Sequence, residues 1–255
     1  MTVGSAQTRI ALYYAPAANS AWWHAGSRWL GRDAESGATL VQPQPDALSR
    51  PLAELTQSPR RYGWHGTLVP PFRLAAGVDT DAVVTAAAAW AAAQTSFALP
   101  VAPAQLGNFI AVRPDTSDGE AALRELAASA LRTLHPLREP ITALDLERRL
   151  TAPLTDRQRA LLREWGYPYV FDEFRFHMTL SDSIDDATER ATLLDWWQHE
   201  APALGPLQVN GAALFVEPAP GEPFSLWRRL PFGINGTTGA ISDASHGATT
   251  TSDAR

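Results

Sequence analysis

Two of the six histidines stand in the same short motif, which reads aromatic residue, histidine, any residue, threonine, leucine. His65 and Thr67 belong to the first copy, and His177 and Thr179 belong to the second. On a β-strand, residues two apart point to the same face. Each copy would therefore offer one imidazole and one hydroxyl to a common surface. The copies lie far apart in the sequence, so they can share a site only if the fold brings two strands together.

Paired imidazoles and hydroxyls suit the chemistry of a phosphodiester. A neutral imidazole can take a proton from an attacking hydroxyl or water, while a protonated one gives a proton to the leaving oxygen. Two hydroxyls can hold the non-bridging phosphoryl oxygens. We interpret His65 and His177 as the acid–base pair, in an order the sequence leaves open, and Thr67 and Thr179 as phosphate-binding residues. The pattern alone also permits two ordinary core or surface histidines.

This chemistry requires neither a metal nor a cofactor, and we predict neither. The chain has no His-Glu-x-x-His motif or similar metal-binding pattern. Asp182, Asp185 and Asp186 resemble a metal site only in composition, and helix capping explains them better.

The basic residues exclude several classes of enzyme. All 21 are arginine, and neither lysine nor cysteine occurs. This excludes a Walker-type phosphate loop, a pyridoxal Schiff base, a lysine-dependent nucleotidyl-transferring ligase and any cysteine nucleophile. The net charge of −6 argues against a long nucleic acid as partner, but a small phosphate ester held by a few arginines remains compatible.

The chain has no stretch that approaches the roughly 20 apolar residues needed to span a bilayer. Its first residues lack the pattern of a secretory signal. We therefore expect a cytoplasmic protein with no membrane partner. We predict a folded domain over residues 1–232 and a disordered tail over 233–255, where hydrophobic residues are few.

The elements that would position the motifs follow from periodicity and capping signals. Strands are predicted at 9–14, 61–68, 97–102, 106–113, 173–180, 206–217 and 224–230. Helices are predicted between Ser20 and Gly31 and at 48–57, 80–94, 118–134, 143–150, 155–165 and 186–200. Both motifs fall in predicted strands. The order of elements indicates an α+β fold with antiparallel sheets, and the chain lacks the Gly-x-Gly-x-x-Gly of a parallel dinucleotide-binding fold.

Several segments together carry a resemblance to a known family. They are residues 11–16, 27–33, 61–68, 70–74, 165–169, 174–180 and 213–218. On these residues, and over about 9–232, the chain resembles the two-histidine (2H) phosphoesterase superfamily, and within it the branch associated with phosphonate metabolism. The resemblance implies two lobes related by a pseudo-twofold axis, each an antiparallel sheet backed by helices, around a central groove. It also implies cleavage of cyclic phosphates or related 2′-linked phosphodiesters. Members of this branch often carry lysine where this chain has Val69, so its substrate contacts are expected to differ.

Two arginines are further candidates for substrate binding. Arg175 lies two residues before His177 and would share its strand face, where it could bind a phosphate oxygen; a salt bridge with Glu173 or Asp172 is the alternative. Arg73 is a similar candidate.

Two tyrosines, Tyr14 and Tyr62, are candidates for stacking on a base or sugar. Strand alternation turns Tyr62 and Trp64 away from His65, which favours a core position for both.

We therefore predict a metal-independent phosphodiesterase that hydrolyses a small cyclic phosphate of ribose or a nucleotide. The link to phosphonate metabolism is implied by the resemblance alone. Two alternatives stay open. One is an RNA-end enzyme acting on 2′,3′-cyclic phosphates or 2′–5′ linkages, phosphodiesterase or ligase-like. The other is a non-catalytic module that binds a nucleotide or sugar phosphate.

Overall fold

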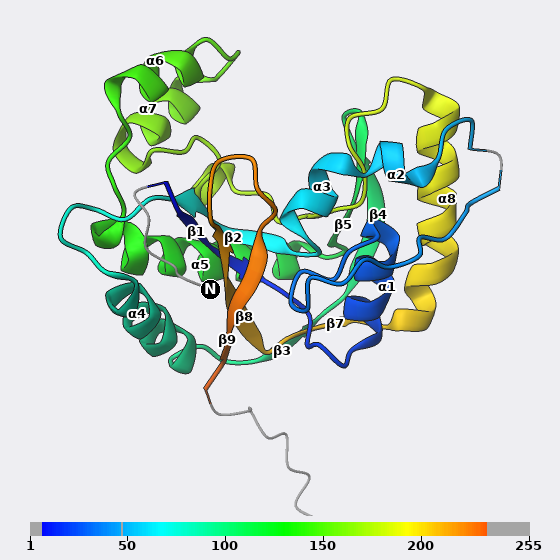
Figure 1. The fold of residues 1–255 in the computed structure, drawn as a ribbon, viewed down its shortest axis with the longest axis horizontal. Coiled ribbons are helices and arrows are strands. Elements are labelled where there is room, and N and C mark those ends of the chain that lie inside the picture. The colour runs from blue at the N-terminus through cyan, green and yellow to red at the C-terminus, as the bar shows by residue number, and fades with distance from the viewer. Residues whose placement is uncertain (1–6, 47, 234–255) are drawn as a thin grey trace, which may run out of the picture.

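A seven-stranded antiparallel sheet forms the centre of the computed structural model, which describes residues 7–46 and 48–233 (Figure 1). The strand order is β4-β5-β6-β2-β1-β8-β9, and β3 pairs with β7 in a separate two-stranded sheet. The strands are β1 (Arg9–Tyr14), β2 (Gly66–Phe72), β3 (Phe97–Leu99), β4 (Val101–Leu106), β5 (Phe109–Pro114), β6 (Met178–Thr179), β7 (Leu207–Val209), β8 (Gly211–Glu217) and β9 (Ser225–Pro231).

Eight α-helices within the described residues surround the sheet. They are α1 (Ala21–Leu30), α2 (Leu52–Leu55), α3 (Gln57–Tyr62), α4 (Thr80–Ala92), α5 (Ser117–Leu134), α6 (Ala143–Leu150), α7 (Asp156–Trp165) and α8 (Ala187–Leu204). Helix α8 packs on β4 and β5, α5 on β2, and α4 on β8 and β9. Helices α6 and α7 project together at one end of the molecule (Figure 1). None of the helices in the described part of the chain is long and apolar enough to cross a bilayer.

The sheet has two halves that meet between β2 and β6. One half is β4-β5-β6 and the other is β2-β1-β8-β9, and Gly66 opposite Met178 is the residue pair that joins them. Each half is antiparallel and is backed by helices. The predicted α+β class with antiparallel sheets is therefore confirmed. The two halves form one continuous sheet through that single pair.

Local capping explains why most helices begin and end where predicted. The Ser20 hydroxyl accepts a hydrogen bond from the backbone of Trp23, and Gly31 ends α1 with a φ of 73°. The Asp79 carboxylate caps α4 in the same way. Such signals lie within a few residues of the element they delimit, so they can be read from the sequence.

The predicted strands at 61–68 and 173–180 are wrong in extent. Residues 57–62 form helix α3, and the strand begins only at Gly66. The Asp182 carboxylate accepts hydrogen bonds from the backbone of Gln57 and Ser58, and so caps α3 from a distant part of the chain. Of the second predicted strand only Met178–Thr179 is regular. The predicted tail, from 234 onward, lies outside the described residues.

Tryptophans fill the core beside the site. Trp64 is completely buried and stacks on Trp197 with ring centroids 6.0 Å apart. A Cβ on Gly26 would lie 2.2 Å from the Trp64 ring, so this close approach requires glycine. The predicted core position of Trp64 is confirmed. Its burial anchors the chain just before His65.

Candidate active site

The register between β2 and β6 brings the two motifs together. Gly66 and Met178 are Cα partners in an antiparallel pair, so His65 lies opposite Thr179 and Thr67 lies opposite His177. Gly66 and Met178 are buried, whereas the four motif side chains are all partly exposed. Because these four flank the central pair, they share one face of the sheet. A local twofold axis through the central pair relates the two copies.

Both histidines make the same hydrogen bond to the backbone. Nδ1 of His65 lies 2.8 Å from the carbonyl oxygen of Gly63, and Nδ1 of His177 lies 2.9 Å from that of Arg175. A carbonyl oxygen only accepts, so Nδ1 must carry a proton in each ring. Nε2 is then the atom of each imidazole left to take or give a proton. The two rings therefore have the same tautomer and the same free nitrogen for acid–base chemistry.

The surroundings of His65 keep this imidazole neutral. The ring stacks on the buried Tyr13 with centroids 3.9 Å apart, and the Thr67 hydroxyl lies 3.4 Å from Nε2. Burial lowers the pKa of His65 to about 4, with a further lowering by the nearby charge of His177, against the opposing effect of the Gly63 hydrogen bond. At neutral pH, Nε2 of His65 therefore has a free lone pair.

The pKa of His177 is also lowered from its usual value. Burial is the main cause, and the positive charge of Arg113 adds to it, while the hydrogen bond to the Arg175 carbonyl opposes both. The ring packs beside Phe109 with centroids 5.8 Å apart. A bound phosphate anion would act in the opposite direction, because a nearby negative charge favours the imidazolium.

A cavity of about 470 Å³ opens over this face of the sheet. His65, Thr67 and Thr179 line it, as do Tyr13 and Tyr62. His177 is not part of this lining, although Phe109, which packs on its ring, is. Three of the four predicted catalytic and phosphate-binding residues thus share one cavity, and the fourth, His177, packs against a residue that lines it.

A second cavity, of about 720 Å³, adjoins the first near helices α6 and α7. Both cavities are lined by Arg9, Pro71, Arg138, Arg149 and Gly166. No local sequence motif marks these three arginines as site residues. The same is true of Tyr13, which reaches His65 because β1 pairs with β2 and sets Tyr13 opposite Thr67.

A buried carboxylate organises one wall of the cavities. Glu217 is fully buried and accepts hydrogen bonds from Arg9 and, at 3.0 Å, from Arg61. Burial acts to raise the pKa of Glu217, but the hydrogen bonds from Arg9 and the backbone of Gly221 hold it below its usual value. Arg61 also donates to the Tyr62 hydroxyl at 2.7 Å. Glu217 therefore positions both Arg9 and Tyr62.

The remaining aromatic candidates divide between the cavity and the core. Tyr62 lines the cavity, so the expected core position is wrong: it ends helix α3, where strand alternation does not apply. Tyr14 is buried, packs against Phe176 and donates to the backbone oxygen of Gln208. The structure thus contradicts a substrate-binding role for Tyr14, because neighbouring residues on β1 face opposite sides and Tyr13 occupies the site face.

The two predicted substrate arginines lie outside the smaller cavity. Arg175 is exposed and donates to the backbone oxygens of Asp172 and Phe174, both at 2.8 Å. It does not share a strand face with His177, because residues 174–177 are irregular. Arg73 lines the larger cavity and lies 4.0 Å from Glu139. Val69 is completely buried.

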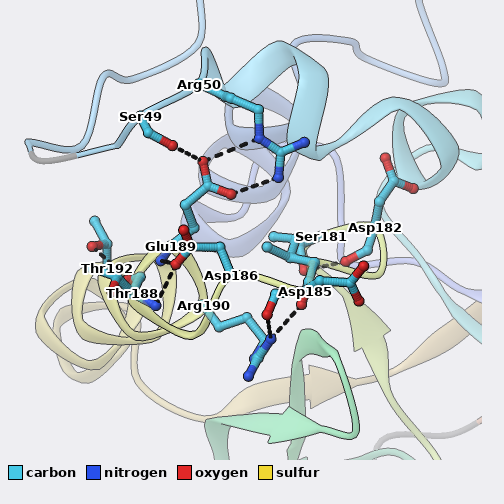
Figure 2. Close-up of polar contacts among 11 residues, drawn as sticks. Ser49, Arg50, Ser181, Asp182, Asp185, Asp186, Thr188, Glu189, Arg190 and Thr192 are labelled. Carbon is cyan, nitrogen blue, oxygen red and sulfur yellow. Dashed lines mark hydrogen bonds and ion pairs between the residues drawn. The ribbon is translucent and has the colours of Figure 1, made fainter.

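Two members of the acidic cluster after β6 cap helices, as predicted, while Asp185 accepts a hydrogen bond from the Asn108 side chain. Asp186 caps α8 by accepting from the backbone of Thr188 and Glu189, and Asp182 caps α3. Figure 2 shows the cluster beside the ion pair between the buried Glu189 and Arg50. Within residues 7–46 and 48–233, no group of three or more histidine, aspartate or glutamate side chains is placed to hold a metal ion.

Comparisons with known proteins place this chain in a family. Two curated relatives are both called ribose 1,5-bisphosphate phosphokinase PhnN. The one from Janthinobacterium sp. (strain Marseille) is 37% identical over 241 residues, and the one from Laribacter hongkongensis (strain HLHK9) is 38% identical over 230 residues. The matches cover 92% and 90% of this chain but 53% of each relative, so the chain spans about half their length.

Among solved structures, Escherichia coli LigT complexed with phosphate aligns over 90% of this chain and all of its own, with a TM-score of 0.43 and 11% identity. This likeness is weak. The model of the family described as a protein of unknown function, DUF1045, matches residues 67–225, which is more than half of the chain. The chain therefore belongs to the DUF1045 family.

Proposed function

We propose that this chain is a phosphodiesterase that hydrolyses a small cyclic phosphate by acid–base catalysis between His65 and His177. One observation carries the proposal: two imidazoles with the same Nδ1 hydrogen bond flank a local twofold axis, each opposite a threonine of the other motif. A core or surface histidine needs no such pairing. Two matched proton carriers beside hydroxyl groups suit in-line displacement at phosphorus.

The proposed reaction assigns different roles to the two rings. Neutral His65 takes a proton from water through Nε2 as the water oxygen bonds to phosphorus. The bond from phosphorus to the leaving oxygen breaks, and protonated His177 gives its Nε2 proton to that oxygen. The product is a phosphate monoester with a free hydroxyl. Exchange with solvent then returns both rings to their starting states.

In this proposal Thr67 and Thr179 bind the non-bridging oxygens. Their hydroxyls lie on the same sheet face as the imidazoles, and both line the cavity. Hydrogen bonds to the oxygens on which charge accumulates would stabilise the transition state. Tyr62, which also lines the cavity, is placed to pack against a sugar or base.

The substrate class rests on cavity size, charge and relatives. A cavity of about 470 Å³ suits a small ester, and the net charge of −6 disfavours a long nucleic acid. The names of both curated relatives refer to a ribose phosphate. We infer a ribose or nucleotide cyclic phosphate as substrate, in a cytoplasmic protein that needs no metal or cofactor. The resemblance to the 2H branch supports a link to phosphonate metabolism.

Phosphorus NMR of a substrate panel tests this proposal. The panel contains 2′,3′-cyclic nucleotides, ribose 1,2-cyclic phosphate and a 2′–5′ dinucleotide, each incubated with the protein and EDTA. Conversion of a cyclic phosphate into a monoester in EDTA would support the proposal. Cleavage of the dinucleotide alone would replace it with an RNA-end activity. Tight binding without turnover of any compound would replace it with a binding module.

A further inference from the structure

Two arginines at the junction of the cavities have no carboxylate partner among the residues that the structure describes. Arg138 donates to the backbone oxygen of Trp165 at 3.1 Å, and Arg149 donates to that of Gly166 at 3.0 Å. These consecutive carbonyls at the end of α7 hold the two guanidinium groups as neighbours. Neither arginine forms an ion pair with any residue of the described chain, although nine other arginines do.

Arg138 is the more deeply placed of the two. Its Nε and Nη1 atoms are buried and have no hydrogen-bond partner among the described residues. Burial and the adjacent charge of Arg149 lower the pKa of Arg138 to about 10. An uncompensated buried cation is costly, and a second positive charge beside it adds to that cost. An anion bound between the two guanidinium groups would relieve both effects.

The surrounding cavities concentrate positive charge in an acidic protein. Six arginines line one or both cavities: Arg9, Arg73, Arg138, Arg148, Arg149 and Arg163. Four carboxylates line the same cavities. Glu217 already neutralises Arg9, and Asp145 pairs with Arg148. The charge that stays unpaired at the junction is that of Arg138 and Arg149. Guanidinium forks of this kind match the oxygens of a phosphate monoester.

We propose that Arg138 and Arg149 bind a second phosphate of the substrate, a monoester carried on the same sugar as the cyclic phosphate that the histidines open. This inference rests on the proposed function, and it names the substrate class as a cyclic phosphate with an additional phosphomonoester. Both arginines line the histidine cavity as well as its neighbour, so one small molecule can reach both sites.

Matched substrate pairs test the second phosphate. We would measure kcat/KM for ribose 1,2-cyclic phosphate with and without a 5-phosphate, and for a 2′,3′-cyclic nucleotide with and without a 5′-phosphate. The wild-type protein should prefer the phosphorylated member of a pair by about 100-fold, and Arg149→Gln should reduce that preference about tenfold. Arg149→Lys, which keeps the charge, should restore part of it.

Arg228→Gln is the matched control, because Arg228 is exposed on β9 and lines neither cavity. It removes one positive charge and should retain the wild-type preference. The inference would be overturned if the wild-type protein had the same kcat/KM for both members of a pair. It would also be overturned if Arg149→Gln kept the wild-type preference. A preference for a dinucleotide ending in a cyclic phosphate over the 5′-phosphorylated mononucleotide would also overturn it, in favour of an RNA end.

Calorimetry with ribose 5-phosphate separates this inference from the proposed function. If no cyclic phosphate is hydrolysed, the proposed function fails while the anion site can still be tested. Weaker binding of ribose 5-phosphate to Arg149→Gln, but not to Arg228→Gln, would then support the site. Equal binding to both variants and the wild-type protein would reject it.

Discussion

His65 and His177 make matching hydrogen bonds but differ in their surroundings. His65 stacks on Tyr13 and its pKa falls to about 4, whereas His177 packs beside Phe109. In the proposed reaction, this difference favours neutral His65 as the base and leaves His177, whose protonation a bound phosphate would favour, as the acid. The symmetric motif does not distinguish the two roles.

The assignment predicts a pH profile displaced to the acid side. Burial lowers the pKa of both rings in the free protein, so protonation of His177 is displaced to lower pH than that of an ordinary histidine. We expect kcat/KM to rise as the pH falls from about 8, and to decrease again near about pH 4, where His65 gains a proton. Initial rates across this range measure the profile. A maximum above about pH 7 would contradict the assignment.

At the scale of elements, local signals were readable from the sequence and distant ones were not. The boundaries of α1 and α4 follow from Ser20, Gly31 and Asp79, which act on their own helices. Helix α3 was missed because the cap that fixes its start, Asp182, comes from another part of the chain. The same distinction applies to the site.

The motif residues share a local pattern, so His65, His177 and their threonines could be predicted. Tyr13, Arg138 and Arg149 could not, because strand pairing and the end of α7 bring them to the cavities. Arg175 was assigned to a strand face that the chain does not form. In the candidate site, a sequence pattern can therefore mark residues that carry their own signature, but not those placed by tertiary structure.

Glu217 links three elements, so we predict that Glu217→Gln destabilises the fold. Its carboxylate lies on β8 and binds Arg9 at the start of β1 and Arg61 near the end of α3. Removing the charge leaves both arginines uncompensated. We expect the free energy of unfolding to fall by about 3 kcal/mol. This is the lower end of the range for breaking a buried ion pair, because both arginines are partly solvated. Urea denaturation measures it.

Glu35→Gln is the control for this experiment. Glu35 pairs with Arg229 at 2.8 Å, but its side chain is 37% exposed. Its loss should cost less than about 1 kcal/mol. Equal costs for the two variants would show that Glu217 does not act as a buried junction.

For the whole molecule, the pair of Gly66 and Met178 is the point at which the two halves of the sheet meet. A Cβ on Gly66 would lie 2.3 Å from the Phe176 ring, which backs this pair. A side chain larger than hydrogen at Gly66 would therefore require the Phe176 ring or the strands themselves to shift. The site depends on the two halves approaching closely at one position.

This arrangement predicts coupling between Gly66 and Phe176. Gly66→Ala should reduce the free energy of unfolding by about 1–3 kcal/mol through overpacking. Phe176→Leu removes part of the ring that the new methyl group meets. In a double-mutant cycle measured by urea denaturation, the double variant should be less destabilised than the sum of the single ones. Additive costs would show that the methyl group and the ring do not meet.

The most direct test of the central claim is the rate of cyclic phosphate hydrolysis by two histidine variants in EDTA. We expect His65→Ala and His177→Ala each to reduce kcat by about 10²- to 10⁴-fold while the circular dichroism spectrum and melting temperature stay near those of the wild-type protein. His199→Ala serves as control, since His199 is exposed on α8 and lines neither cavity, and it should retain the wild-type rate. Wild-type hydrolysis by either of the first two variants would contradict acid–base catalysis by this pair.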